Sequence, residues 1–101
     1  MKIVAVTACP TGIAHTYMVA EVLKKEATRR GISIKIETQG AMGIENPLSA
    51  ADIASADLCI IASDIDIEGK ARFVGAKTHV LSIEQLLSKA DDQLESLFSR
   101  L

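Results

Sequence analysis

The stretch Cys9-Pro10-Thr11-Gly12-Ile13-Ala14-His15-Thr16 follows a short apolar run at residues 3–6 and opens a long helical pattern. A thiol placed in this way lies at the end of a strand and directly before the N-terminus of a helix. The unpaired N–H groups and the dipole of that helix end favour an anion. The same setting lowers the pKa of a thiol and increases the fraction of reactive thiolate. The stretch therefore predicts that Cys9 is a nucleophile.

The residues after Cys9 are suited to binding an anion through their backbone. Pro10 fixes φ beside the thiol, and Gly12 can adopt a positive φ, as a loop wrapped around an oxyanion needs. We expect Cys9 to accept a phosphoryl group and to form a phosphocysteine intermediate. The phosphate-binding residues would then be Pro10, Thr11, Gly12, Ile13, Ala14, His15 and Thr16.

The side chains in this loop have different expected roles. His15 is expected to bring a hydrogen bond, and charge when it is protonated, to the phosphoryl group. The hydroxyls of Thr11 and Thr16 could donate to phosphoryl oxygens, or either could serve only as a helix cap.

The composition indicates one aliphatic domain that spans residues 1–101. Apolar residues make up 49% of the chain and aromatic residues 3%, and the net charge is −2. No basic stripe with interleaved aromatics indicates nucleic acid. No apolar run approaches the roughly 20 residues of a membrane span. Because residues 1–3 lead directly into the first predicted strand, we expect no signal peptide. The two cysteines, Cys9 and Cys59, are not in a zinc spacing, so we expect no metal, no cofactor and a reducing cytoplasm.

The hydrophobic pattern alternates between strands and helices. Strands are predicted at residues 2–7, 32–38, 58–62 and 78–81. Helical segments are predicted at residues 13–30, after a Ser49–Asp52 capping box, at 70–73 and at about 82–100, and residues 39–47 are predicted as a loop.

This alternation predicts an α/β fold of three layers, α/β/α, which is Rossmann-like. The first and third strands are continuously apolar and should be central, whereas the second alternates and should lie at an edge. The predicted sheet has four parallel strands in the order 2-1-3-4. Ligands of such sheets bind at the carboxyl ends of the strands, where Cys9 lies.

Other polar residues are weaker candidates for the site. Asp64 and Asp66 are expected to lie in a solvated loop, because carboxylates repel a phosphoryl group. Glu37 and Gln39 could shape the site, meet a partner or be ordinary strand surface. His79 is expected to be structural or exposed, and Cys59 to be buried inside its strand.

The run ACPTGIAHT at residues 8–16 resembles the active-site loop of the IIB components of the fructose family of the bacterial phosphoenolpyruvate-dependent sugar phosphotransferase system (PTS). Residues 36–40 resemble the next hallmark of that family, as do Asn46, residues 49–53, residues 71–73 and Gly75. The resemblance runs from Lys2 to about Gly75. It implies a transferase whose cysteine takes a phosphoryl group from a phosphohistidine of the IIA domain. The cysteine then passes the group to a fructose-type sugar bound by the membrane IIC domain, and the domain works at the cytoplasmic face.

Two other functions stay open from the residues. Cys9, His15 and Thr16 form a C-x5-H-T pattern, which is close to the C-x5-R-S/T loop of cysteine-dependent phosphatases, and arsenate reductases use a similar thiolate loop. The chain lacks the arginine of that loop, which would bind phosphate in a bidentate manner. A non-catalytic interaction module would leave the cysteine-centred loop unexplained. The residues do not identify the sugar, which the IIC domain selects in the resembled family.

Because Cys9 precedes a helix N-terminus and Cys59 lies within a strand, only Cys9 should have a pKa below the ordinary thiol value of about 8.5. Alkylation of the folded protein at neutral pH, followed by peptide mapping, should label Cys9 alone. Labelling of Cys59 before Cys9 would contradict the assignment.

Overall fold

In the computed structural model of the protein, the described residues are 2–8, 13–40, 43–63, 66–84 and 86. Their secondary structure alternates along the chain, as the hydrophobic pattern predicted. The elements are β1 (Lys2–Ala8), α1 (Ile13–Arg29), β2 (Ser33–Gly40), β3 (Gly43–Glu45), α2 (Ala50–Ser55), β4 (Leu58–Ser63), the 3-10 helix η1 (Lys70–Phe73) and β5 (Thr78–Leu81).

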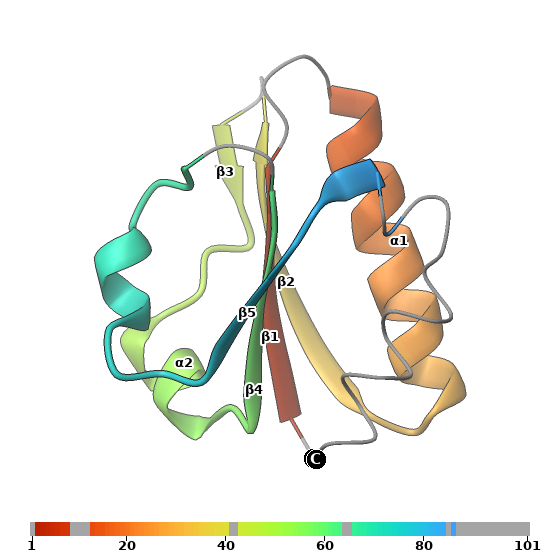
Figure 1. The fold of residues 1–101 in the computed structure, drawn as a ribbon. Helices are drawn as coiled ribbons and strands as arrows, with labels where there is room; N and C mark the ends of the chain where they lie inside the picture. Colours follow the sequence, from red (N-terminus) through yellow and green to blue (C-terminus); the bar gives the residue numbers. More distant parts are fainter. Residues whose placement is uncertain (1, 9–12, 41–42, 64–65, 85, 87–101) are drawn as a thin grey trace.

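The strands form one mixed sheet of five strands in the order β3-β2-β1-β4-β5 (Figure 1). Strands β2, β1, β4 and β5 are parallel to their neighbours, so the predicted α/β class and the relative order of these strands are confirmed. The prediction of a purely parallel sheet of four strands was wrong. Strand β3 runs antiparallel to β2, so β2 is not an edge strand, and the segment predicted as a loop contains a strand.

Strand β3 forms because the chain turns back tightly after β2. Gly40 pairs with Gly43, so only residues 41 and 42 connect the two strands. Gly43 has a φ of 92° and Asn46 a φ of 52°, conformations that glycine and asparagine adopt at little cost. All residues of β3 are exposed, so it has no hydrophobic alternation by which a sequence pattern could reveal it.

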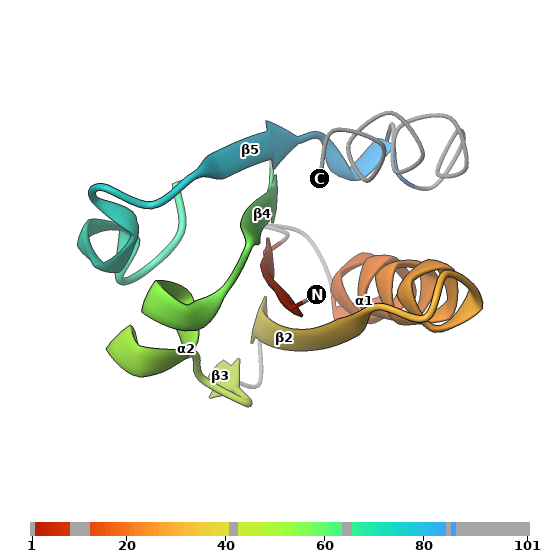
Figure 2. The same ribbon diagram turned by 90° about the horizontal axis from the view of Figure 1, so that it is seen from below.

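Helices cover both faces of the sheet (Figure 2). Helix α1 lies on one face, and α2 and η1 lie on the other. Residues 83, 84 and 86 are helical and begin the last predicted helix, whose remainder lies outside the described residues. Asp52 N donates to Ser49 Oγ at 3.1 Å and Ser49 N donates to Asp52 Oδ2 at 3.0 Å, which confirms the predicted capping box of α2.

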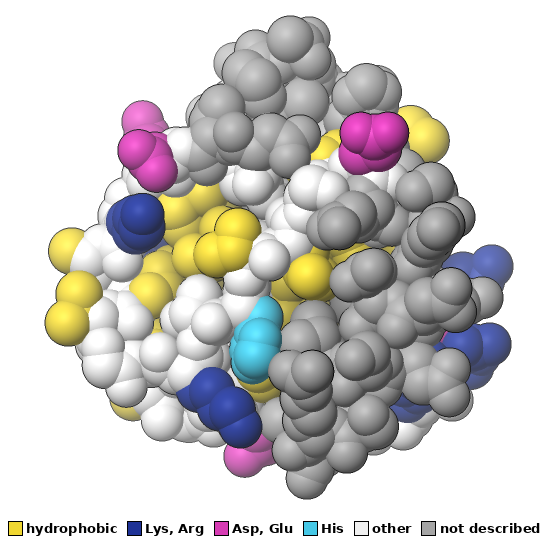
Figure 3. Space-filling view, in the orientation of Figure 1, with side chains coloured by type: hydrophobic (Ala, Val, Ile, Leu, Met, Phe, Trp, Pro, Cys, Tyr) yellow, Lys and Arg dark blue, Asp and Glu magenta, His cyan; other side chains and the backbone are white. Residues whose placement is uncertain are grey.

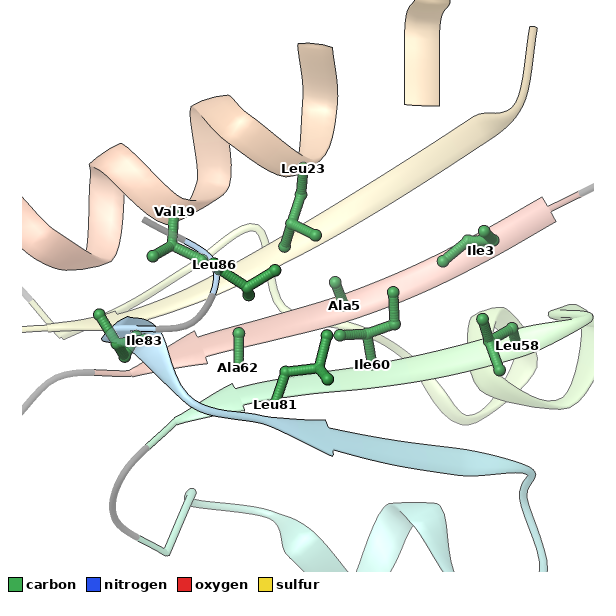
Figure 4. Close-up of a cluster of buried hydrophobic side chains, with 10 residues drawn as sticks. All are labelled: Ile3, Ala5, Val19, Leu23, Leu58, Ile60, Ala62, Leu81, Ile83 and Leu86. Carbon is green, nitrogen blue, oxygen red and sulfur yellow. The ribbon is translucent and has the colours of Figure 1, made fainter. Parts of the chain in front are cut away.

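The core has two parts because the central strands are buried on both faces. Alternate residues of β1 and β4 face α1, where they pack with residues of that helix (Figure 4). This cluster contains Ile3, Ala5, Val19, Leu23, Leu58, Ile60, Ala62, Leu81, Ile83 and Leu86. The cluster on the other face contains Val4, Val6, Ala8, Leu48, Ile53, Cys59, Ile61, Ile67 and Phe73. The continuous apolar pattern of β1 and β4 therefore predicted their central position correctly.

Helix α1 packs on the sheet through one apolar face. Val19, Leu23 and Ala27 are fully buried, and Tyr17 and Ala20 are half-buried. Glu26 is only 7% exposed, and its carboxylate forms ion pairs with Arg29 and Arg30 at the helix end. Gly31, with a φ of 70°, follows the helix where the sequence predicted its end.

Strand β5 forms the other edge of the sheet, and hydrophobic side chains are exposed on it and near it. Val80 on this strand is 69% exposed and Val74, just after η1, is 85% exposed. Figure 3 shows the face that carries β5, with hydrophobic side chains gathered between η1 and β5.

Replacement of Leu23 by alanine should leave a cavity under α1 and lower the free energy of unfolding by about 2–5 kcal/mol. Met18 on the same helix is 52% exposed, so Met18→Ala is a matched control that should change stability by less than about 0.5 kcal/mol. Urea unfolding followed by circular dichroism measures both. Equal effects of the two substitutions would contradict the packing described for α1.

Candidate functional site

The carboxyl ends of β1, β2 and β4 meet at one edge of the sheet, which we call the carboxyl edge. Ala8, the last residue of β1, pairs with Gln39 of β2 on one side and with Ser63 of β4 on the other. Helix α1 begins at Ile13, only five positions further along the chain. The predicted nucleophile Cys9 therefore belongs to the connection between the end of β1 and the start of α1. Its own placement lies outside the described residues, as do those of Pro10, Thr11 and Gly12.

The remaining predicted phosphate-binding residues belong to α1. Ile13, Ala14 and His15 form its first turn with no acidic residue among them, which suits an anion at a helix N-terminus. Thr16 is fully buried beneath this turn, and its hydroxyl has no hydrogen-bond partner within the described residues. Its carbonyl accepts a hydrogen bond from Thr7 Oγ1 at 3.3 Å, so the turn is fixed to the end of β1.

A pocket of about 350 Å³ lies beside α1, between this helix, β2 and β3. Tyr17 donates its hydroxyl to the Glu45 carboxylate, and this contact raises the pKa of Tyr17. The bond connects the first turns of α1 to β3. Strand β3, which sequence analysis missed, thus contributes to the surface around the helix end.

On the opposite face of the sheet, a buried carboxylate organises the carboxyl edge. Glu37 of β2 is fully buried and accepts four hydrogen bonds. Arg72 of η1 donates through Nη1 to Oε1 at 2.7 Å and through Nη2 to Oε2 at 2.9 Å. The backbone N–H of Leu48 donates to Oε1 at 2.8 Å, and Gln39 Nε2 donates to Oε2 at 2.7 Å. Each oxygen of this carboxylate therefore accepts two hydrogen bonds from groups of the protein itself.

The guanidinium of Arg72 donates all of its hydrogen bonds within the protein. Besides its fork onto Glu37, Nη1 donates to the carbonyl of Leu48 at 2.9 Å and Nη2 to that of Glu68 at 3.1 Å. Nε donates to the carbonyl of Gly69 at 2.9 Å. A guanidinium has five N–H donors, and these contacts use all of them. Arg72 consequently has no donor left for a phosphoryl group.

Gln39 extends this network to the segment that follows β4. Its Nε2 donates to the Glu68 carbonyl at 2.9 Å, and its Oε1 accepts from the Glu68 N–H at 2.8 Å. The side-chain amide thus pairs with the backbone of Glu68 as a neighbouring strand would. We call Glu37, Gln39 and Arg72 the rim clamp, because together they connect β2, the segment at Leu48 and residues 68–69.

The charges of the clamp stabilise one another. Burial alone would raise the pKa of Glu37, but hydrogen bonds from Arg72, Gln39 and the Leu48 N–H outweigh burial and lower it. The hydrogen bond to Glu37 raises the pKa of Arg72. Both groups are therefore charged at neutral pH, and the clamp adds no net charge to the edge.

The clamp excludes one of the open interpretations of Glu37 and Gln39. Neither residue is ordinary strand surface: Glu37 is buried by Arg72 and the segment at Leu48, and Gln39 is anchored to Glu68. Sequence analysis did not assign a role to Arg72. The available signals were the family hallmarks at residues 36–40 and 71–73, which turn out to contact each other.

Three of the other candidates lie within the described residues. Asp66 is exposed and lies 3.6 Å from the ammonium of Lys70, in agreement with a solvated loop, whereas Asp64 lies outside the described residues. Cys59 is buried in β4, which raises the pKa of its thiol and supports a structural role. His79 lies half-exposed on β5. Within the described ranges, no group of three or more His, Cys, Asp and Glu side chains could hold a metal ion.

Comparison with known proteins identifies the family. The family described as "PTS system, Lactose/Cellobiose specific IIB subunit" matches residues 4–96. The chain is 49% identical to the "PTS system fructose-like EIIB component 2" of Escherichia coli K12, over 89% of this chain and 85% of that protein. It is 50% identical to the "PTS system fructose-specific EIIB'BC component" of Vibrio cholerae, over 98% of this chain and 17% of that protein.

Solved structures agree with these relatives. The crystal structure of a "Predicted Fructose Specific IIB" from Escherichia coli has a TM-score of 0.89 and 40% identity, over 94% of this chain and 84% of that chain. A domain of the fructose-specific IIABC component of Borrelia burgdorferi has a TM-score of 0.89 and 42% identity, over 97% of this chain and 93% of that chain. The fold and these relatives define a PTS IIB domain. The chain belongs to this family, and its relatives are of the fructose type.

Replacement of Glu37 by glutamine should lower the free energy of unfolding at pH 7 by about 3–5 kcal/mol, because Arg72 then keeps a charge without its buried partner. The folded-state pKa of Glu37 is lowered, so its stabilising contribution is complete above the ordinary glutamate pKa of about 4.3 and is lost as the pH falls further. The gap between the wild type and the variant should therefore shrink at pH 3.

Glu68→Gln is the matched control for this measurement, because the Glu68 side chain is exposed and only its backbone bonds to the clamp. Urea unfolding should show a change of less than about 0.5 kcal/mol for the control. A Glu37→Gln protein as stable as the wild type at pH 7 would show that the ion pair contributes nothing.

Proposed function

We propose that this chain is the phosphoryl carrier of a fructose-type sugar PTS. The Sγ thiolate of Cys9 attacks the phosphorus of a phosphohistidine on a IIA domain, so that a P–S bond forms as the P–N bond breaks. A hydroxyl of a fructose-type sugar bound to a membrane IIC domain then attacks the same phosphorus. The P–S bond breaks so that the thiolate leaves, the hydroxyl releases its proton to solvent, and the sugar is phosphorylated during uptake.

The observation that carries this proposal is the position of residues 9–12 between the end of β1 and the N-terminus of α1. An anion at a helix N-terminus is stabilised by the unpaired N–H groups and the helix dipole. Both the thiolate and the phosphoryl group that replaces it are anions. The family to which the chain belongs, and the fructose-type names of its relatives, support the same reaction.

The arrangement of arginines favours a carrier over a phosphatase. Cysteine-dependent phosphatases need a guanidinium that binds the transferring phosphoryl group. Of the arginines in the described ranges, Arg29 and Arg30 lie at the far end of α1, and every donor of Arg72 is used by the clamp. The loop offers His15 in place of the arginine. Groups that assist transfer would then come from the docked donor or acceptor, which restricts transfer to the correct partner.

The proposed partners are a phosphorylated IIA domain as donor and a sugar-loaded IIC domain as acceptor. Relatives named EIIB'BC and EIIBC join a B and a C component in one chain, which supports the acceptor. No helix in the described part of this chain is long and apolar enough to cross a membrane. The chain would then act at the cytoplasmic face through its contact with IIC.

The carrier and phosphatase hypotheses differ in the fate of the phosphocysteine. A phosphatase needs an acid that protonates the leaving group and a base that activates water. The Glu37 carboxylate cannot take either role, because it is held by the Leu48 N–H and by Arg72. After phosphorylation by a phosphohistidyl IIA domain, the isolated protein should keep its phosphate on Cys9 for minutes or longer at neutral pH. Phosphorus NMR and peptide mapping measure this lifetime.

The same preparation should show negligible turnover of p-nitrophenyl phosphate. Cys9→Ser should abolish phosphorylation by the IIA domain, and Cys59→Ser should not. Steady hydrolysis of the aryl phosphate by the wild type, lost in Cys9→Ser, would assign the protein to the phosphatases instead.

A further inference from the structure

The rim clamp joins the end of β2 to the segment that follows β4, and these two strands flank β1. Gln39 pairs with Ala8 through the backbone, and its side chain holds both backbone groups of Glu68 in the segment after β4. Ala8 packs in the same cluster as Ile67 and Leu48, which lie beside the clamped positions. The clamp therefore spans the carboxyl end of β1, from which the chain continues into Cys9.

Arg72 holds residues 68–69 in place partly through a close contact between its guanidinium and Gly69. The φ of Gly69 is 72°, and a Cβ built on it would lie 2.5 Å from Nε and 2.8 Å from Nη2 of Arg72. Any side chain at this position would collide with the guanidinium. Gly69 is thus needed for its conformation and also for the room that it leaves to Arg72.

We propose that Gln39 and Arg72 are positioning residues for phosphoryl transfer at Cys9, because with Glu37 they hold residues 68–69 against the end of β2. Neither side chain touches the phosphoryl group. They act by keeping the segments on both sides of the β1 terminus in one arrangement, so that the partner that carries or receives the phosphoryl group meets a fixed surface. This inference rests on the proposed function.

Two substitutions loosen the clamp from different sides. Gln39→Ala removes both bonds to Glu68 and leaves the pair between Glu37 and Arg72 in place. Gly69→Ala displaces the guanidinium and keeps its charge. Gly75→Ala is the matched control, since Gly75 has a similar φ of 83° but nothing lies within 4 Å of its Cβ position. It imposes the same backbone strain without touching the clamp.

The measurement is the single-turnover rate of phosphoryl transfer from a saturating phosphohistidyl IIA domain to the full chain. Gln39→Ala and Gly69→Ala should transfer roughly 10- to 100-fold more slowly than Gly75→Ala, since a misplacement of about 1 Å can cost this much. Alkylation of Cys9 by iodoacetamide should keep its rate and pH profile, because a small reagent needs no docking surface. A variant that was only less stable would not show slow transfer from the IIA domain together with an unchanged alkylation of Cys9.

Hydrogen exchange locates the change. In Gln39→Ala, the Glu68 amide should lose protection because its acceptor is gone, while the Leu48 amide keeps its bond to Glu37. Transfer at the Gly75→Ala rate in both clamp variants, with the Glu68 amide exposed, would overturn the inference and leave the proposed function intact. A wild-type protein that takes no phosphoryl group on Cys9 would overturn both.

Discussion

The ion pair between Glu37 and Arg72 is the interaction on which the carboxyl edge depends. A fully buried carboxylate is costly unless charge and hydrogen bonds compensate for its lost hydration. Here compensation is complete, because the carboxylate accepts a forked guanidinium, a backbone N–H and a side-chain amide. Each of these donors belongs to a segment that the pair thereby fixes. A charge that would otherwise destabilise the domain thus determines how its connections are arranged.

The two faces of the sheet contribute differently to the site. On one face, α1 presents its N-terminus to the connection that contains Cys9, and Thr7 fastens its first turn to β1. On the other face, the rim clamp holds the segments after β3 and β4. The first face supplies the field that favours an anion, and the second gives the surroundings a fixed shape. The proposed carrier role, in which one protein donates the phosphoryl group and another accepts it, depends on both.

The sequence predicted the features that depend on neighbouring residues and missed those that depend on distant ones. The buried strands β1 and β4, the end of α1 before Gly31 and the capping box at Ser49 are encoded locally, and the structure confirms them. The burial of Glu37 depends on Arg72, 35 positions later, so the alternation of residues along β2 could not reveal it. Strand β3 escaped prediction because it is short and fully exposed. The cysteine loop was recognisable because its chemistry is contiguous in the sequence, and its role remains a prediction.

The central claim is that Arg72 is part of the structural clamp and does not bind the phosphoryl group. The most direct test is nitrogen-15 NMR of the Arg72 side chain, recorded before and after phosphorylation of Cys9 by a IIA domain. Our account predicts that its Nε and Nη resonances keep their positions and their slow exchange with water, because the guanidinium stays forked onto Glu37. Large shifts of these resonances on phosphorylation, with the Leu48 amide losing its protection, would show that Arg72 leaves Glu37 for the phosphate and would contradict the account.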